Sequence, residues 1–271
     1  MATTLEKKAT EIRGEVLDML YACQSGHPGG SLSCVEILLA LYENGVLRID
    51  PKNPGWEGRD RFVMSKGHAC PTLYAILADL GYFDKAELMN LRQLHSILQG
   101  HPDMHKCPGI DASTGSLGQG MAMGIGYALA GKRADHEPFD VYVLTGDGET
   151  QEGIIWESAM GAAHYKLDNL TVLLDHNRLQ IDGPNDDVMS LGDIGRKYEA
   201  FGWEVLHVDG HDIDAITAAC KKPRIPGKPR FIDCDTIKGK GVSFMENQVG
   251  WHGRPMKQEE YEAAKLEMGC R

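Results

Sequence analysis

The stretch VYVLTGDGE, at residues 141–149, decides the fold because an apolar run leads directly into a Gly-Asp-Gly turn. An apolar run without strict alternation is typical of a strand buried on both faces, as in a parallel sheet. Similar runs lie at residues 170–174, 203–208 and 230–233. Helical patterns lie near residues 118–131, 152–165, 193–201 and 212–221. This alternation predicts an α/β domain of three layers with a central, mainly parallel sheet.

The N-terminal part of the chain has helical patterns only. Apolar spacing predicts a helix over residues 5–22. Ser33 and Glu36 have the form of a capping box for a second helix that ends near Gly45. Pro71 suits the first turn of a third helix. Residues 238–255 are rich in glycine and polar residues, which predicts a long functional loop.

Composition limits the classes of function. With 271 residues, of which 42% are hydrophobic, the chain can form one large domain with a substantial core. A net charge of -11 disfavours binding to nucleic acid and to anionic membranes. No signal peptide is apparent, and no apolar run approaches the roughly 20 residues that span a bilayer. The seven cysteines include no C-x-x-C pair, so we expect reduced thiols and a cytoplasmic protein.

Polar residues follow two of the predicted strands. Asp147 follows the first strand, and Asn177 follows the next one along the chain. Ligands bind at the carboxyl ends of strands in open α/β sheets, and oxygen ligands suit Mg²⁺ or Ca²⁺. Gly146 and Gly148 would let a phosphate approach the backbone closely. A tight turn and a turn residue after a strand are the simpler interpretations of these two segments.

A Gly-Asp-Gly followed about 30 residues later by an Asn at a strand end resembles the thiamine-diphosphate-binding fold. The surrounding sequence is similar to that of the transketolase family in particular. The segments that carry this resemblance are SGHPGG (25–30), SKGHA (65–69), GHP (100–102), TGSLGQG (114–120), GDGETQEG (146–153), DHNRLQIDG (175–183), VDGHD (208–212), KGKG (238–241) and WHG (251–253). They occur in the family's order along nearly the whole chain.

The resemblance implies a role for each matching residue. The implied ligands of Mg²⁺ or Ca²⁺ are Asp147, Asn177 and the carbonyl group of Leu179. The residues implied to bind thiamine diphosphate, or to communicate with it, are His68, Gly115, Leu117, Gly146, Gly148, Glu152, Ile181 and His252. The residues implied to face the substrate and to assist proton transfer are His27, His101 and His252. Glu157 matches an acidic residue near a subunit interface.

Each of these side chains also has a simpler interpretation. Imidazole titrates near neutral pH and can move protons on a sugar, but a lone histidine is as often structural. Two glutamates on one helix can be a solvated face, and Lys238 and Lys240 can bind phosphate or lie on a solvated loop. We expect His176 to have no catalytic role. The histidines expected to be structural or exposed are His95, His105, His136, His164 and His207.

The resemblance also implies a partner. In transketolases a glutamate on a second domain activates the cofactor, and this chain contains no second α/β unit. We therefore expect residues 1–271 to be a single diphosphate-binding domain of a split transketolase. A partner chain would carry the pyrimidine-binding and C-terminal domains, in an α2β2 assembly that transfers a two-carbon ketol unit between sugar phosphates.

Three alternatives remain open at this point, the first of them a related thiamine enzyme. The chain could belong to a 1-deoxyxylulose-5-phosphate synthase or could be a 2-oxo-acid dehydrogenase subunit. It could be a non-catalytic subunit that binds the cofactor and regulates a partner. It could also be a specialised transketolase that acts on an unusual sugar.

Overall fold

The computed structural model describes residues 3–133 and 138–270. Its centre is a sheet of five strands in the spatial order β1-β2-β3-β7-β6, and all neighbouring strands are parallel. The strands are β1 (Arg61–Met64), β2 (Val141–Gly146), β3 (Leu170–His176), β6 (Glu204–Asp209) and β7 (Arg230–Asp235). The predicted parallel sheet is therefore confirmed.

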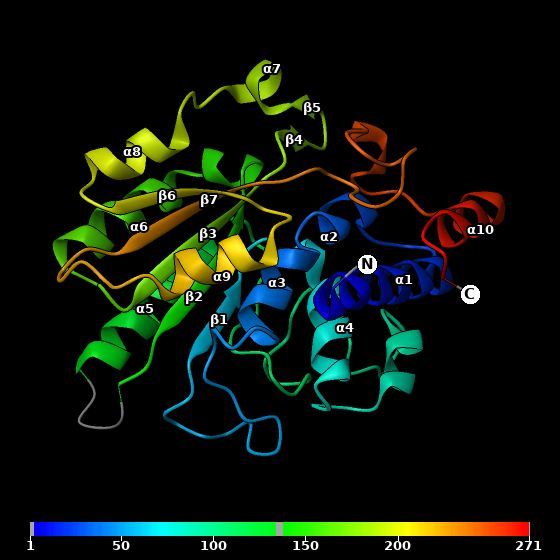
Figure 1. The fold of residues 1–271 in the computed structure, drawn as a ribbon, viewed down its shortest axis with the longest axis horizontal. Helices are drawn as coiled ribbons and strands as arrows, with labels where there is room; N and C mark the ends of the chain where they lie inside the picture. The colour runs from blue at the N-terminus through cyan, green and yellow to red at the C-terminus, as the bar shows by residue number, and fades with distance from the viewer. Residues whose placement is uncertain (1–2, 134–137, 271) are drawn as a thin grey trace.

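Helices cover both faces of the sheet, as Figure 1 shows for α3 and α9 on one side and α6 and α8 on the other. The first layer contains α1 (Thr4–Cys23), α3 (Val35–Tyr42), α4 (Cys70–Asp79) and α9 (Ile213–Lys221). The second layer contains α5 (Gln119–Arg133), α6 (Gly153–His164) and α8 (Ile194–Ala200). Short helix α2 (Pro28–Leu32) and the last helix α10 (Gln258–Glu267) complete the first side.

Alternate residues of each strand belong to different hydrophobic cores. In β2, Tyr142 and Leu144 belong to the core beneath α1, α3, α4 and α9. Val141 and Val143 belong to the core beneath α5, α6 and α8. Because successive side chains of a strand point to opposite faces, strands between two layers must be apolar at nearly every position. This explains the uninterrupted apolar runs in the sequence.

Two expectations differ from the structure. Strand β1 was not predicted, because it has only four residues and begins with Arg61. Ser33 does not cap a helix: α3 begins at Val35, and its N-cap residue makes no side-chain hydrogen bond. The Ser33 hydroxyl instead donates to Asp175 Oδ2 at 2.6 Å, and the Glu36 carboxylate pairs with Arg13 at 2.7 Å. Buried polar partners outcompete the local cap.

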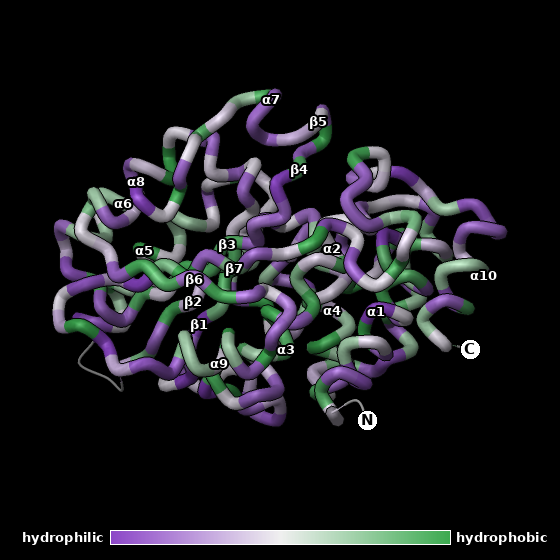
Figure 2. Tube along the Cα trace, turned by 45° about the horizontal axis from the view of Figure 1, so that its top comes forward, coloured by the Kyte–Doolittle hydropathy of each residue, from purple (hydrophilic) through white to green (hydrophobic). Residues whose placement is uncertain are grey.

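The carboxyl ends of β2 and β3 lie side by side, because Gly146 pairs in register with Asp175. The Gly-Asp-Gly turn and Asn177 therefore meet at one edge of the sheet. A small antiparallel hairpin, β4 (Leu179–Gln180) with β5 (Gly183–Pro184), and the short helix α7 (Asn185–Met189) follow Asn177. Figure 2 shows hydrophobic stretches around β5 and α7 within this otherwise polar segment.

Candidate functional site

A cavity of about 410 Å³ lies at this edge of the sheet, and every predicted site residue lines it. These residues are His27, His68, His101, Gly115, Leu117, Gly146, Asp147, Gly148, Glu152, Asn177, Leu179, Ile181 and His252. Segments from residue 27 to residue 252 thus converge on one space, although what each residue binds stays a prediction. Glu157 is exposed on α6 and is not among the lining residues.

Three residues that line the cavity offer oxygen atoms as ligands: the Asp147 carboxylate, the Asn177 amide and the Leu179 carbonyl group. The Asp147 carboxylate is 3% exposed, and it accepts hydrogen bonds from the N–H groups of Gly148, at 2.7 Å, and Arg178. Burial and the nearby Asp175 carboxylate raise the pKa of Asp147. Asn177 Oδ1 accepts from Leu179 N at 3.2 Å. A carboxylate, an amide oxygen and a backbone carbonyl are the hard ligands that Mg²⁺ and Ca²⁺ prefer.

Asp175 orients the amide group of Asn177. Its Oδ2 accepts a hydrogen bond from Asn177 Nδ2 at 3.2 Å, so the amide nitrogen faces Asp175 and the amide oxygen faces away. Asp175 is fully buried and also accepts from Lys66, Ser33 and Thr236. Burial opposes ionisation, but the Lys66 ammonium and these hydrogen bonds lower the pKa of Asp175. A charged carboxylate therefore fixes the orientation of the predicted metal ligand.

Two buried lysines, Lys66 and Lys238, also line the cavity. Lys66 is 1% exposed, and its ammonium pairs with Asp175. Lys238 is also 1% exposed, but among the described residues its Nζ hydrogen-bonds only to neutral groups, the Leu179 carbonyl oxygen and His252 Nδ1, both at 2.8 Å. Burial and the neighbouring Lys66 charge lower the pKa of Lys238 to about 8. The solvated-loop alternative is therefore wrong for Lys238.

Three imidazole rings line the cavity together with these two lysines. The ring centroids of His27, His68 and His252 lie 5.0 to 5.6 Å apart. Burial first, and then nearby positive charges, lower the pKa of His27 to about 4 and that of His252 to about 3. The same causes hold the pKa of His68 well below its usual value. All three rings are neutral at pH 7 in this state.

Gly115 and His101 both line the cavity and lie in close contact. Gly115 has a φ of +136°, and a Cβ atom there would lie 2.9 Å from Cγ and Cδ2 of His101. Only glycine satisfies both the backbone conformation and the contact. Burial first, and then Arg92, lower the pKa of His101. The loop that carries Leu117 thus depends on Gly115 to approach His101.

Sequence reasoning assigned no role to Glu149, although it lies in the quoted Gly-Asp-Gly-Glu segment. The carboxylate is 3% exposed and accepts hydrogen bonds from Gly118 N, at 2.7 Å, from Gly146 N, at 3.0 Å, and from the Ser65 hydroxyl. It therefore joins the end of β2 to the two loops on either side of the cavity. An acidic residue directly after a buried strand was the available signal.

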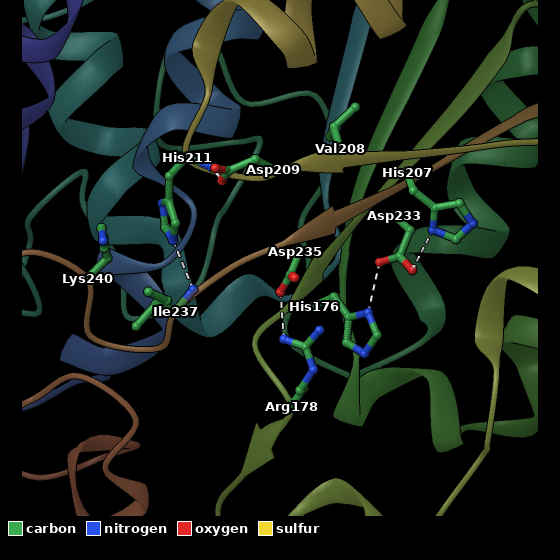
Figure 3. Close-up of a pocket in the computed structure, with 10 residues that line it drawn as sticks. All are labelled: His176, Arg178, His207, Val208, Asp209, His211, Asp233, Asp235, Ile237 and Lys240. Atoms are coloured by element: carbon green, nitrogen blue, oxygen red, sulfur yellow. Dashed lines mark hydrogen bonds and ion pairs between the residues drawn. The ribbon is translucent and has the colours of Figure 1, made fainter.

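A larger cavity of about 640 Å³ lies beyond the ends of β3, β6 and β7 (Figure 3). Its charged groups mostly pair with one another. His176 and His207 contact the two oxygens of Asp233, at 2.8 and 3.2 Å, and Arg178 pairs with Asp235 at 2.6 Å. These pairs hold the end of β3 from the side. That His176 has no catalytic role stays a prediction.

The residues of the smaller cavity fit a metal-bound diphosphate. Among the described residues, no group of three or more His, Cys, Asp or Glu side chains is placed to hold a metal ion. A cation on Asp147 and Asn177 therefore needs further oxygen ligands, which a diphosphate supplies. A Cβ atom on Gly146 would meet no atom closer than 3.8 Å, so this backbone has space for a ligand. None of the described helices is long and apolar enough to cross a membrane.

Comparison with known proteins gives consistent matches. Residues 5–271 match the model of the transketolase thiamine-diphosphate-binding domain. The chain is 44% identical over 265 residues to the 6-deoxy-6-sulfo-D-fructose transketolase subunit SqwG of Clostridium sp. (strain MSTE9), covering 97% of this chain and 96% of that one. It is 41% identical over 269 residues to a subunit of the apulose-4-phosphate transketolase of Phocaeicola vulgatus, covering 99% and 95%.

The match to solved structures is equally extensive for this chain. A transketolase mutant from Pichia stipitis superposes with a TM-score of 0.92 at 34% identity, covering 100% of this chain and 41% of that chain. The chain therefore spans nearly the full length of the two subunits and about two fifths of the solved transketolase. By sequence and by structure, the chain belongs to the transketolase family and corresponds to its thiamine-diphosphate-binding domain.

Proposed function

We propose that this chain is the diphosphate-binding subunit of a split transketolase. Together with a partner subunit it transfers a two-carbon ketol unit from a ketose to an aldose, and at least one of the sugars carries an anionic group. The names of two relatives of nearly equal length support a division into subunits. Those names refer to a sulfosugar and to apulose 4-phosphate, which favours a specialised sugar for this chain too.

The buried cation Lys238 is the observation that carries the proposal. Lysine is almost never fully buried unless it is paired. Within the described part of the chain Lys238 has no carboxylate partner, and the charge of Lys66 adds to its positive environment. A diphosphate bound above Asp147 and Asn177 would neutralise this charge. We assign Lys238, His68 and His252 to the diphosphate.

We further propose that Asp147, Asn177 and the Leu179 carbonyl hold Mg²⁺ or Ca²⁺. Lys238 Nζ already donates to the Leu179 carbonyl oxygen, whose second lone pair remains for a cation. Leu117 and Ile181 are 37% and 61% exposed and present apolar surface at the cavity. These two side chains would pack against the rings of the cofactor.

When bound, thiamine diphosphate supplies the nucleophilic carbon that attacks the ketose carbonyl. The protein's part is to position the sugar and to move its protons. His27 and His101 line the cavity, and their lowered pKa values leave both rings neutral at pH 7. A neutral imidazole can accept a proton from a sugar hydroxyl and return it to a carbonyl oxygen. We assign this role to His27 and His101, with His252 orienting hydroxyl groups.

We propose that the partner carries the pyrimidine-binding domain, and that two such pairs form an α2β2 assembly. The test is ketol transfer with thiamine diphosphate and Mg²⁺, using this chain alone, the partner alone and the mixture. The donors should include xylulose 5-phosphate and 6-deoxy-6-sulfofructose. Ribose 5-phosphate serves as the acceptor. Activity in the mixture only is the expected result. Full activity of this chain alone would contradict the split, and no transfer by the mixture would favour a regulatory subunit.

A further inference from the structure

The VDGHD motif, which follows β6, has no part in the proposed function so far. Its glycine brings the ends of two strands together, because Gly210 N donates to Asp235 O at 2.8 Å. A Cβ atom on Gly210 would lie 2.9 Å from the same backbone oxygen and closer still to the Thr236 methyl group, so this approach requires glycine. His211 therefore projects from the end of β6 toward the segment that follows β7 (Figure 3).

The imidazole ring of His211 joins a buried carboxylate to the backbone of this segment. Its Nε2 accepts a hydrogen bond from Ile237 N at 2.9 Å, and its Nδ1 lies 3.0 Å from Glu36 Oε2. A ring nitrogen that accepts a backbone N–H carries no proton, so the ring proton is on Nδ1 and is donated to Glu36. Both nitrogens of this neutral tautomer therefore have a partner.

The Glu36 carboxylate reaches the same segment a second time, through Arg13. Its two oxygens pair with Arg13 Nη1 at 2.7 Å and Nη2 at 2.8 Å, and Arg13 Nε donates to Lys240 O at 2.9 Å. Glu36 and Arg13 are 7% and 6% exposed. Burial opposes the ionisation of Glu36, but His211 and Arg13 lower its pKa to about 2. One charged carboxylate thus reaches the backbone at Ile237 and at Lys240.

These two contacts lie on either side of Lys238. Residues 236–240 follow β7 and belong to no strand or helix. Two backbone hydrogen bonds hold the middle of this segment: Asn247 N donates to Lys238 O at 2.9 Å, and Gly239 N donates to Gly29 O at 3.0 Å. Without a strand ladder, the position of the Lys238 backbone also depends on the side chains that hold its two neighbours.

We propose that Glu36, through His211 and Arg13, is a positioning residue for the diphosphate site. It holds the backbone on both sides of Lys238 so that the buried ammonium points into the cavity. The inference rests on the assignment of Lys238 to the diphosphate in the proposed function. Glu36 and His211 are not among the residues that line the cavity, so they act on the cofactor through Lys238. Groups behind a ligand commonly fix its orientation in this way.

The test separates the two hydrogen bonds of His211 in the enzyme reconstituted with its partner. In His211→Gln the amide oxygen can take the place of Nε2 and keep the bond from Ile237 N. In His211→Asn the shorter amide takes the place of Nδ1 and keeps only the bond to Glu36. The matched control is Asp212→Ala, because the Asp212 carboxylate caps α9 and accepts from Ala215 N instead.

Calorimetry measures the Kd of thiamine diphosphate at saturating Mg²⁺, and a thermal melt measures stability. His211→Asn is expected to raise Kd about tenfold, as for the loss of one buried hydrogen bond. His211→Gln should stay within about threefold of the wild type, and kcat at saturating cofactor should change less than about twofold in both variants. Asp212→Ala should melt at a lower temperature with an unchanged Kd, because only a helix cap is lost.

A double variant shows whether His211 acts through Lys238. Lys238→Met with His211→Asn should bind the cofactor as Lys238→Met does, because the second change has nothing left to position. Additive losses in the double variant, or equal losses in His211→Asn and His211→Gln, would overturn the proposal. If His211→Asn does not fold, His211→Leu takes its place with the same expectations, since leucine keeps neither bond. Wild-type affinity in Lys238→Met alone would instead overturn the assignment of Lys238 in the proposed function, and this inference with it.

Discussion

The Lys66 ammonium and the Asp175 carboxylate form an ion pair beneath the candidate site, with side chains 1% and 0% exposed. Lys66 follows β1 and Asp175 lies in β3, so the pair joins two strands that flank β2. Asp175 also accepts a hydrogen bond from the amide nitrogen of Asn177. The pair therefore connects the core to the geometry of the predicted metal ligand.

Replacement of Asp175 by Asn should weaken both folding and cation-dependent cofactor binding. It leaves the Lys66 charge buried without a partner, and breaking one side of a buried pair costs roughly 3–5 kcal/mol. The free energy of unfolding is measured with urea, and binding of thiamine diphosphate is titrated at increasing Mg²⁺. Thr236→Val is the control, because Thr236 donates to Oδ1 and not to the oxygen that holds Asn177. Equal Mg²⁺ dependence in both variants would argue against the orienting role.

Replacement of Lys238 by Met should lower the affinity for thiamine diphosphate by about tenfold or more, because a charge-assisted contact is lost. The same change should leave the stability of the cofactor-free chain unchanged or higher, since an unpaired buried cation is costly. Calorimetry measures the first quantity and urea denaturation the second. Lys240→Met is the control, because Lys240 is on the same loop with its side chain 34% exposed. If both variants bind the cofactor as the wild type does, Lys238 is not a diphosphate ligand.

Stability should depend on pH through His27. Its pKa is lowered from 6.5 to about 4 in the folded chain, chiefly by burial, so the unfolded chain binds the extra proton first. Stability from the neutral ring is therefore present above pH 6.5 and is lost as the pH falls from 6.5 to about 4. His27→Asn should have a smaller slope of unfolding free energy against pH in this window. Identical slopes would mean that His27 titrates normally in the folded chain.

The sequence predicted the layers because the physics that determines them is local. Strands between two cores are apolar at nearly every position, and the sequence of β2 alone shows this pattern. Strand β1 was not predicted, because four residues that begin with Arg61 form too short an apolar run to indicate a strand. The site residues were predicted from short motifs. The carboxyl ends of β2 and β3 lie side by side, and this brings the Gly-Asp-Gly turn and Asn177 together as expected.

The remaining features depend on contacts between distant segments. Apart from nearby Asn177, the partners of Asp175 are Ser33, Lys66 and Thr236, and no spacing within the chain relates them. Lys238 lies in a polar, glycine-rich segment whose composition indicates exposure. It is buried because its side chain packs on Gly29, where a Cβ atom would lie 3.0 Å from Lys238 Cγ. Composition alone could not decide between the two interpretations of Lys238.

The last prediction concerns the surface that the partner covers. Met123 on α5 and Met160 on α6 are 41% and 55% exposed. Both helices begin beside residues that line the cavity, Leu117 and Glu152. A partner that closes the cavity lies against these helix starts, and exposed apolar side chains further along the same helices fit a protein interface. Met160→Glu should therefore weaken association with the partner by about tenfold or more in sedimentation equilibrium. Leu266→Glu is the matched control, since Leu266 is 82% exposed on α10, which lies on the far side of the molecule from α6 (Figure 1). Weakening by Leu266→Glu alone would place the partner on the α10 side and leave the exposed methionines of α5 and α6 without that role.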